Sequence, residues 1–364
     1  MSGGHQLLLS DPDMLRNIWD SPASAWCSWR GTWFRPRLLG RRPPGQWGSY
    51  SLLMRIVRPR RTILAVPGSS DRFIAKSRAL PVDAVFLDLE DAVAPSAKEE
   101  ARRRIIAALN SGEGWKAGLV TVRVNDWTTP WTYLDVIEVV RAAGSHIDAL
   151  VLPKCAGRDD VVALDRLLTQ VEASCGLPGG HIGLEAQIET AQGLLAVNDI
   201  AAASRRLDSL VFGPGDFMAS LGMAQLSVGS QPEGYPADAF HHPLLAILLA
   251  ARAHGLQAID GPFVGIRDID GFIASARCSA ALGYDGKWVL HPDQVTAGND
   301  IFTPGAAQVE RAGRIVAAYE SASSADGGAV GAIVVDGEMV DEAGVKLAQA
   351  LLAKAGLTGA PARE

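Results

Sequence analysis

Several kinds of sequence feature are absent from this chain of 364 residues, and each absence narrows the class of protein. No run of 18 apolar residues occurs, so no segment is predicted to span a membrane. The glycines and prolines are not gathered into low-complexity tracts, so most of the chain is expected to fold. The cysteines are scattered and form no CxxC pair, which predicts neither a zinc site nor a disulfide framework. They are Cys27, Cys155, Cys175 and Cys278.

Lysine is missing from the first 61 residues, which are nonetheless strongly basic. Ten arginines against three aspartates give this segment a net charge of +7, so the rest of the chain carries −13 to reach the total of −6. An acidic body argues against nucleic-acid binding, because neutralising phosphates requires a basic face. A small anionic substrate stays compatible, since it requires only a local positive pocket.

Residues 1–57 follow neither the 3.6-residue period of a helix nor the 2.0-residue period of a strand. We interpret them as a poorly ordered extension rich in tryptophan and arginine, which a start site placed upstream of Met54 would explain. An organellar presequence is an alternative, because residues 22–61 are rich in arginine and lack acids, but Asp11, Asp13 and Asp20 fit it poorly. A nucleic-acid or membrane-surface arm is the third alternative. We expect a cytoplasmic protein, or one of the mitochondrial matrix if the segment is a presequence.

From Arg61 onward, short strand-like runs alternate with helix-like segments. Several runs are continuously apolar, as is typical of strands that are buried on both faces. Strands are predicted at Thr62–Val66, Ala84–Asp88, Leu119–Val124, Ala149–Leu152, Ile182–Ile188, Ser209–Phe212, Gln257–Ile259 and Trp288–Leu290. Helices are predicted at Ser96–Leu109, Thr132–Ala143, Val161–Ser174, Ala191–Ala203, His242–His254 and Ile269–Leu282.

The number and size of these units predict a TIM (β/α)8 barrel over residues 58–321, because about 250 residues is the usual length of that fold. A doubly wound open sheet is the alternative, which the lack of a GxGxxG motif after the first strand disfavours. Ser96 and Asp159 are predicted to cap helices at their N-termini. Helix ends are predicted at four glycines, Gly144, Gly176, Gly255 and Gly283.

The last barrel helix is predicted at Ala306–Ser321, and residues 322–364 follow as a C-terminal lid or arm. This tail begins with a break rich in glycine and serine at Ser321–Gly331. A short hairpin-like piece at Ala332–Gly337 and a helix at Glu342–Ala355 complete it.

Acidic side chains follow several predicted strands, at the end of a barrel where active sites lie. Glu189 follows the fifth strand and Asp216 the sixth, so we expect both to reach one ion. Carboxylates together with waters are the ligands that Mg2+ prefers, and like charges this close would be costly without a cation. Glu90 and Asp91, after the second strand, are expected to accept hydrogen bonds from waters on the metal.

These four acids also have structural interpretations. Glu189 suits a helix N-terminus, where the helix dipole stabilises a negative charge. Asp216 suits the cap of a turn after Gly-Pro-Gly, and Glu90 and Asp91 suit the start of the next helix. A single acid at a strand end is therefore weak support for a metal site, whereas several on adjacent strands are stronger.

The basic residues at the same end of the predicted barrel are equally open to two interpretations. Arg123 follows the third strand and suits either a substrate contact or an ion pair with the acids. For Lys154 and His291, roles in structure and in function stay open. The coincidence of several acids with one arginine favours a functional site.

At these positions the sequence resembles the citrate lyase beta subunit and malyl-CoA lyase family, part of the HpcH/HpaI aldolase/citrate lyase superfamily. The similarity runs from about residue 60 to 321. The stretches that carry it are Val66-Pro67-Gly68-Ser69, Leu87-Asp88-Leu89-Glu90-Asp91-Ala92-Val93, Val122-Arg123-Val124-Asn125, Leu152-Pro153-Lys154, Ile188-Glu189-Thr190, Gly213-Pro214-Gly215-Asp216-Phe217, and Gly286-Lys287 through His291-Pro292. The tail Val335-Asp336-Gly337-Glu338-Met339-Val340-Asp341 resembles the family's C-terminal lid motif.

The resemblance implies a TIM barrel whose Mg2+, or Mn2+ in its place, is held by Glu189 and Asp216. Glu90 and Asp91 would arrange the waters of the metal. Arg123 would contact the substrate carboxylate or the thioester oxygen.

The resemblance also implies that Asp341 reaches a neighbouring subunit's site as the catalytic acid–base group, in a homotrimer or hexamer. Coenzyme A would cross the barrel mouth, with Arg72 and Lys76 as phosphate contacts. The N-terminal extension and the loop from Asp126 to Tyr133 depart from the family pattern, and the loop leaves the acyl-group preference open.

We therefore hypothesise a Mg2+-dependent carbon–carbon lyase acting on a 3-hydroxyacyl-CoA such as malyl-, citramalyl- or citryl-CoA. Its products would be acetyl- or propionyl-CoA and a 2-oxo acid. Three alternatives stay open: a malyl-CoA thioesterase, the beta subunit of a multi-subunit citrate lyase, and a non-catalytic barrel that serves as a binding protein.

Overall fold

Eight parallel strands form a closed barrel in the computed structural model, which describes residues 58–325 and 331–358. The barrel closes because β1 pairs in parallel with both β2 and β8. This confirms the predicted TIM barrel, and the open-sheet alternative is wrong. The predicted extension, residues 1–57, lies outside the described residues. The strands are β1 (Thr62–Pro67), β2 (Ala84–Asp88), β3 (Leu119–Arg123), β4 (Ala149–Leu152), β5 (Gly183–Ile188), β6 (Leu207–Phe212), β7 (Gln257–Asp260) and β8 (Gly286–Val289).

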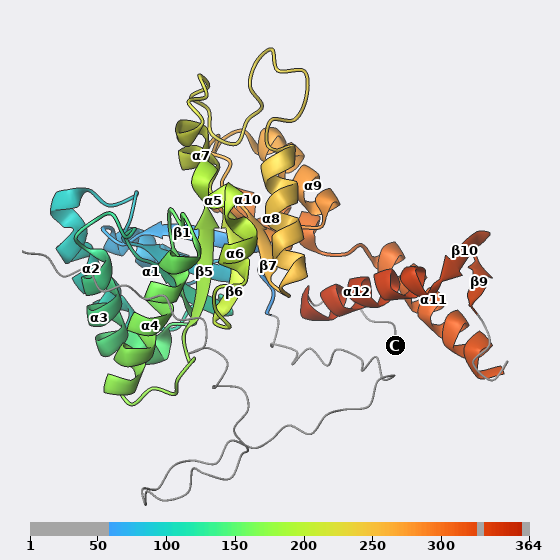
Figure 1. The fold of residues 1–364 in the computed structure, drawn as a ribbon, viewed down its shortest axis with the longest axis horizontal. Helices are drawn as coiled ribbons and strands as arrows, with labels where there is room; N and C mark the ends of the chain where they lie inside the picture. Colours follow the sequence, from blue (N-terminus) through green and yellow to red (C-terminus); the bar gives the residue numbers. More distant parts are fainter. Residues whose placement is uncertain (1–57, 326–330, 359–364) are drawn as a thin grey trace, which may run out of the picture. The chain divides into compact units, whose positions relative to one another are not determined.

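Helices connect the strands, as Figure 1 shows. Those of the barrel are α1 (Asp71–Ser77), α2 (Lys98–Leu109), α3 (Thr132–Ala143), α4 (Arg158–Ser174), α5 (Ala191–Leu195), α6 (Val197–Ala201), α7 (Pro214–Ser220), α8 (His241–Ala253), α9 (Ile269–Leu282), α10 (Asp293–Phe302) and α11 (Ala306–Ala325). Two short 3-10 turns, Pro95–Ala97 and Gly144–His146, complete the set within the described ranges.

Helix ends were predicted better than helix starts. Gly176, Gly255 and Gly283 follow or cap their helices with positive φ, a conformation that glycine adopts without strain. The caps predicted at Ser96 and Asp159 are wrong. Ser96 lies inside a 3-10 turn, and Gly157 precedes α4.

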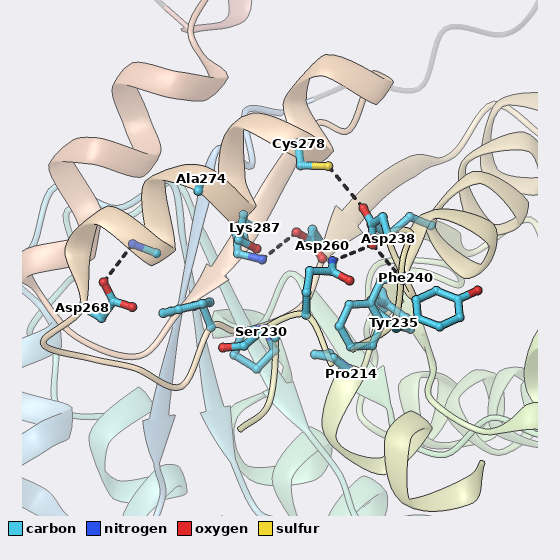
Figure 2. Close-up of a pocket in the computed structure, with 18 of the residues that line it drawn as sticks. Pro214, Ser230, Tyr235, Asp238, Phe240, Asp260, Asp268, Ala274, Cys278 and Lys287 are labelled. Atoms are coloured by element: carbon cyan, nitrogen blue, oxygen red, sulfur yellow. Dashed lines mark hydrogen bonds and ion pairs between the residues drawn. The ribbon is translucent and has the colours of Figure 1, made fainter. Parts of the chain in front are cut away.

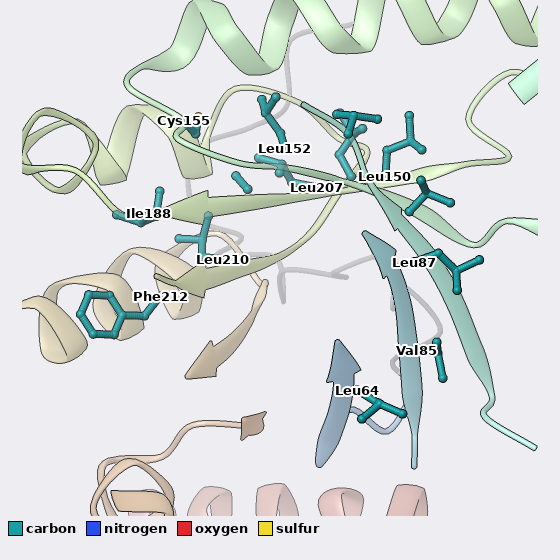
Figure 3. Packing of buried hydrophobic residues seen from close by; sticks show 14 of the residues in the cluster. Leu64, Val85, Leu87, Leu150, Leu152, Cys155, Ile188, Leu207, Leu210 and Phe212 are labelled. Atoms are coloured by element: carbon teal, nitrogen blue, oxygen red, sulfur yellow. The ribbon is translucent and has the colours of Figure 1, made fainter. Parts of the chain in front are cut away.

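The strands are buried on both faces, which explains why their sequences are continuously apolar. Inside the barrel, a small cluster includes Phe86, Val211 and Trp288, and the rings of Phe86 and Trp288 lie 4.2 Å apart. Between strands and helices lies a much larger cluster, part of which Figure 3 shows along β4, β5 and β6. Packing on both faces fixes the strand ends, and with them the side chains that follow each strand.

The C-terminal tail contains a hairpin, β9 (Ala332–Val335) and β10 (Glu338–Asp341), followed by α12 (Glu342–Thr358). The predicted hairpin-like piece, Ala332–Gly337, covers only its first strand and its turn. Asp336 and Gly337 both have positive φ in the turn, as the tightest hairpin connections require. The helix α11 packs against α12 and β9 and ends four residues later than predicted. Among the described helices, none has the length and apolarity to cross a bilayer.

Candidate active site at the carboxyl ends of the strands

Glu189 directly follows β5 and is almost fully buried, with an exposed fraction of 1%. Its carboxylate accepts hydrogen bonds from the backbone N–H of Lys154, at 2.6 Å, and from the side-chain amide of Gln187. Gly213, at the end of β6, makes room for it, since a Cβ there would lie 2.3 Å from a carboxylate oxygen of Glu189. The first glycine of the Gly-Pro-Gly turn is therefore needed to leave space for the side chain of Glu189.

Asp216 lies in the first turn of α7, on the loop that follows the neighbouring strand β6. Its carboxylate is 3.5 Å from the ammonium nitrogen of Lys154. The same ammonium contacts Glu90 and lies 3.1 Å from Asp91. Acids that follow β2, β5 and β6 thus surround one residue, since Glu189 binds the peptide N–H of Lys154 and the other three face its side chain.

Arg123, the last residue of β3, is buried and held in one orientation. Its Nε and one terminal nitrogen each donate to a carboxylate oxygen of Asp88 at 2.7 Å. The other terminal nitrogen lies 3.1 Å from Glu90, and the guanidinium carbon lies 5.5 Å from the ring centres of Phe86 and Trp288. Arg123 therefore forms the ion pairs with acids that were one of its two predicted roles. One of its terminal nitrogens faces the acid cluster.

Asp88, the last residue of β2, also belongs to the site, although no role was predicted for it. It is 1% exposed, and besides Arg123 it accepts hydrogen bonds from the backbone N–H groups of Glu90 and Ala92. It therefore holds both the arginine and the turn that carries Glu90 and Asp91. A buried carboxylate at the end of an apolar strand is the signal that would have identified it, because such a group requires partners.

The cluster has an excess of negative charge. Five carboxylates, of Asp88, Glu90, Asp91, Glu189 and Asp216, face the two cations Arg123 and Lys154. Burial, together with the charge of Asp216, raises the pKa of Glu189 to about 8 against the opposing effect of Arg123. Burial also raises the pKa of Glu90 to about 7.

The donor set fits a hard divalent cation. Carboxylate oxygens are the ligands such ions prefer, and a doubly charged ion would stabilise the ionised form of Glu189, whose pKa burial and the charge of Asp216 raise. Among the described residues, no three His, Cys, Asp or Glu side chains converge on one point. An ion here would accordingly be held by two carboxylates and complete its shell with water and substrate, as is usual for Mg2+.

The other predicted site residues lie apart from this cluster. Arg72 and Lys76 are exposed on α1 and form no ion pair with any described residue. Asp341 is exposed at the end of β10, where it accepts a hydrogen bond from the backbone N–H of Gly344. His291 follows β8 and pairs with Asp293 at 3.3 Å.

A cavity of about 600 Å3 lies beside the site, between α8, α9 and the loop that precedes α8. Figure 2 shows Lys287 and Asp260 at its centre, paired at 2.6 Å and both buried. Phe212 and Pro214, from the turn that carries Asp216, also line it. The carboxylates of the acid cluster do not line this cavity, so the cluster and the cavity are separate features of the barrel.

The chain is similar in sequence to a known protein family. A sequence model described as HpcH/HpaI aldolase/citrate lyase matches residues 61–292, well over half of the chain. An L-malyl-CoA/beta-methylmalyl-CoA lyase of Cereibacter sphaeroides is 39% identical over 312 residues, which cover 83% of this chain and 96% of the relative. A (3S)-malyl-CoA thioesterase of the same organism is 35% identical over 297 residues, covering 82% and 95%.

Solved structures share the barrel. The protein CitE of Mycobacterium tuberculosis, in complex with magnesium, acetoacetate and coenzyme A, is 28% identical and superposes with a TM-score of 0.63 over 83% of this chain and all of that one. A citrate lyase of Burkholderia xenovorans superposes with a TM-score of 0.73 over 86% of this chain and 97% of that one. At 22% identity, this second likeness concerns the fold alone.

Proposed function

The chain belongs to the HpcH/HpaI aldolase/citrate lyase family and is a carbon–carbon lyase, and we propose that it cleaves a 3-hydroxyacyl-CoA of the malyl-CoA type. The products would be acetyl- or propionyl-CoA and a 2-oxo acid such as glyoxylate. The observation that carries the proposal is the cluster of Glu90, Asp91, Glu189 and Asp216 around Lys154, with Arg123 beside it. Membership of a lyase family removes the non-catalytic alternative.

We propose that Glu189 and Asp216 hold the metal, Mg2+ or in its place Mn2+, and that Glu90 and Asp91 receive hydrogen bonds from its waters. Bound there, the ion would supply Lewis-acid polarisation of the substrate's hydroxyl and adjacent carboxylate. The oxygen donor set and its excess of negative charge support this assignment. So does the magnesium named with the similar protein of M. tuberculosis.

Arg123 would stabilise the charge that develops during cleavage. The bond between the hydroxyl-bearing carbon and the carbon next to the thioester breaks, and its electron pair passes to the thioester as an enolate. A buried guanidinium that Asp88 holds in place is suited to that oxyanion, because it needs no rearrangement as the charge forms. The ion pair with Asp88 raises the pKa of Arg123 despite its burial, so the group stays cationic.

Protonation of the enolate carbon completes the reaction, and we propose Asp341 of a neighbouring copy as the donor. The hydroxyl loses one proton and the carbon gains one, so cleavage consumes no water and no oxidant. In the proposed assembly, residues 322–364 form the lid that carries Asp341 over the barrel of residues 58–321 in the next copy. Arg72 and Lys76 would bind phosphates of coenzyme A, which agrees with their exposure and with the absence of an ion pair between them and any described residue.

The test is a panel of CoA thioesters. The protein would be incubated with Mg2+ and malyl-, β-methylmalyl-, citramalyl- or citryl-CoA, and any released oxo acid trapped with phenylhydrazine. We expect an oxo acid to form in step with acyl-CoA, and Glu189→Gln to abolish its formation. If no thioester of the panel yields an oxo acid, the proposed activity is wrong.

A malyl-CoA thioesterase is the second candidate, because one relative at 35% identity carries that name. Hydrolysis would release the free thiol of coenzyme A and intact malate. A thiol reagent added to the same assay separates the two reactions, since a lyase yields oxo acid without free thiol. A beta subunit acting on a carrier-protein thioester would instead leave the whole CoA panel uncleaved.

A further inference from the structure

Lys154 adopts a backbone conformation that lysine seldom has. Its φ is +48°, and Asp336 is the other non-glycine residue with positive φ in the part of the chain that the structure describes. Asp336 lies in a tight hairpin turn, where this conformation is ordinary. Lys154 instead follows the buried strand β4, where a left-handed conformation strains a residue with a Cβ and would not strain glycine.

The conformation brings both ends of Lys154 to the acid cluster. The backbone N–H donates to Glu189 at 2.6 Å, while the side chain turns to Glu90, Asp91 and Asp216. Of the described cations, Lys154 alone forms an ion pair with Asp216. A glycine would adopt this backbone conformation without strain but would provide no ammonium group. The presence of lysine in this strained position therefore indicates a role for its charge.

The two proposed metal ligands are thus bound to one residue. Lys154 is a half-buried cation, with 27% of its side chain exposed, and it lies where it neutralises the carboxylates in the absence of a metal. A divalent ion bound by Glu189 and Asp216 would lie close to the same ammonium. Two cations near one set of carboxylates repel each other.

We propose that Lys154 is a built-in counterion of the acid cluster: it holds the carboxylates together in the metal-free protein and weakens divalent-metal binding by competing for Asp216. The inference rests on the proposed function in taking Glu189 and Asp216 as the metal ligands. Lys154 is accordingly a positioning residue that sets the metal affinity of the site.

The experiment measures Mg2+ binding to the whole protein by isothermal titration calorimetry, with Mg2+ alone as the probe. Lys154→Met removes the charge and keeps the length of the side chain. Lys154→Gly removes the charge and also relieves the backbone, so it folds even if Lys154→Met does not. Lys154→Arg keeps the charge. Lys116→Met is the control for the loss of a lysine, because Lys116 is exposed and lies outside the acid cluster.

We expect Lys154→Gly and Lys154→Met to bind Mg2+ about tenfold more tightly than the unchanged protein, the size of effect that removing a nearby like charge has on a charged site. Lys154→Arg and Lys116→Met should bind as the unchanged protein does. Thermal unfolding adds a second readout, because Mg2+ should raise the melting temperature more in the two charge-loss variants than in the others.

The outcomes separate this proposal from the proposed function. If the unchanged protein binds Mg2+ and the charge-loss variants bind it equally or less tightly, the counterion role is wrong and the metal site stands. If Lys154→Gly binds Mg2+ and the unchanged protein does not, the counterion role is supported and the proposed metal-dependent activity is wrong. If neither binds, both are wrong.

Discussion

The position of the Glu189 side chain depends on Gly213 having no Cβ. The space that its carboxylate occupies is the space that a Cβ on Gly213 would fill, at 2.3 Å from the oxygen. We predict that Gly213→Ala displaces Glu189 and lowers Mg2+ affinity by about tenfold or more, the usual cost of disturbing a ligand's support. Calorimetric titration with Mg2+ measures it.

Gly215 supplies the matched control for that variant. It lies two residues further in the same turn, where an added Cβ would meet nothing closer than 3.8 Å. Gly215→Ala should therefore bind Mg2+ as the unchanged protein does. Equal losses from both substitutions would show that the turn tolerates no side chain at all, and the steric account of Glu189 would be wrong.

The buried glutamates also predict a pH dependence of stability. Burial raises the pKa of Glu189 to about 8 and that of Glu90 to about 7, above the ordinary value of 4.5. Between pH 4.5 and 8 the folded, metal-free protein therefore binds more protons than the unfolded chain. Its free energy of unfolding should fall as pH rises through this window, by at most about 1.4 kcal/mol per pH unit for each such group.

Urea denaturation in the presence of a chelator, at intervals from pH 5 to pH 8, measures this slope. Glu189→Gln should flatten it, because an amide does not titrate. Saturating Mg2+ should reverse part of the trend, since a metal binds the ionised carboxylates. A slope that is the same in Glu189→Gln and in the unchanged protein would contradict the assignment of the proton to Glu189.

At the residue scale, the order of the strands in the sequence predicted which acids lie close together. It did not predict which residues hold those acids in place. The acids after β2, β5 and β6 could be grouped because parallel strands in a barrel end at one rim. The sequence could mark Asp88 as a strand-end carboxylate in need of partners, but the roles of Asp88 and Lys154 at the site could not be predicted. They depend on hydrogen bonds and a backbone torsion that involve residues far away in the sequence, such as Arg123 and Glu189.

At the scale of elements, a buried ion pair joins α2 to α3. Arg102, 2% exposed, pairs with the fully buried Asp135, whose other oxygen accepts hydrogen bonds from Asn125. We predict that Arg102→Ala lowers the free energy of unfolding by about 3–5 kcal/mol, because it leaves a buried carboxylate unpaired. Urea denaturation measures the loss.

The next residue of the same helix is the control. Arg103 is exposed and pairs with Glu99 and Glu100 on the surface of α2. Surface ion pairs contribute roughly 0–1 kcal/mol, so Arg103→Ala should change stability little. If the two variants lost similar stability, helix propensity and not the buried pair would explain the effect.

The elements themselves followed from the hydrophobic pattern, which is continuous in strands buried on both faces and periodic in helices buried on one face. The predicted strand Ala84–Asp88 and helix Thr132–Ala143 match the structure residue for residue. The predicted helix Ala191–Ala203 is two short helices that meet at Ala196. No glycine or proline lies at Ala196, so the local sequence pattern did not predict the break.

At the scale of the whole molecule, the site is assembled from strands spread over more than a hundred residues, and the barrel brings them to one rim. The described tail does not add to it within one chain, since Asp341 is exposed and forms no ion pair with any described barrel residue. Val334 and Met339 on the same hairpin are also exposed, at 74% and 75%. An exposed acid on the same hairpin as exposed apolar side chains agrees with the proposed lid, which docks on another copy.

Shared sites predict recovery of activity when two inactive variants assemble together. Asp341→Ala lacks the proton donor and Glu189→Gln lacks a metal ligand, so each alone should be inactive. In mixed rings, a site is intact where a barrel from the first variant meets a lid from the second. Random assembly should restore about a quarter of full activity in a closed cyclic oligomer.

The control uses two variants of the same barrel. Glu189→Gln and Arg123→Ala both damage residues that one chain contributes, so co-assembly leaves every site defective whatever the order of subunits. Oxo-acid release after co-expression measures both mixtures. Recovery in the first mixture and none in the second would establish that the lid acts across copies, because a site completed within one chain could recover in neither.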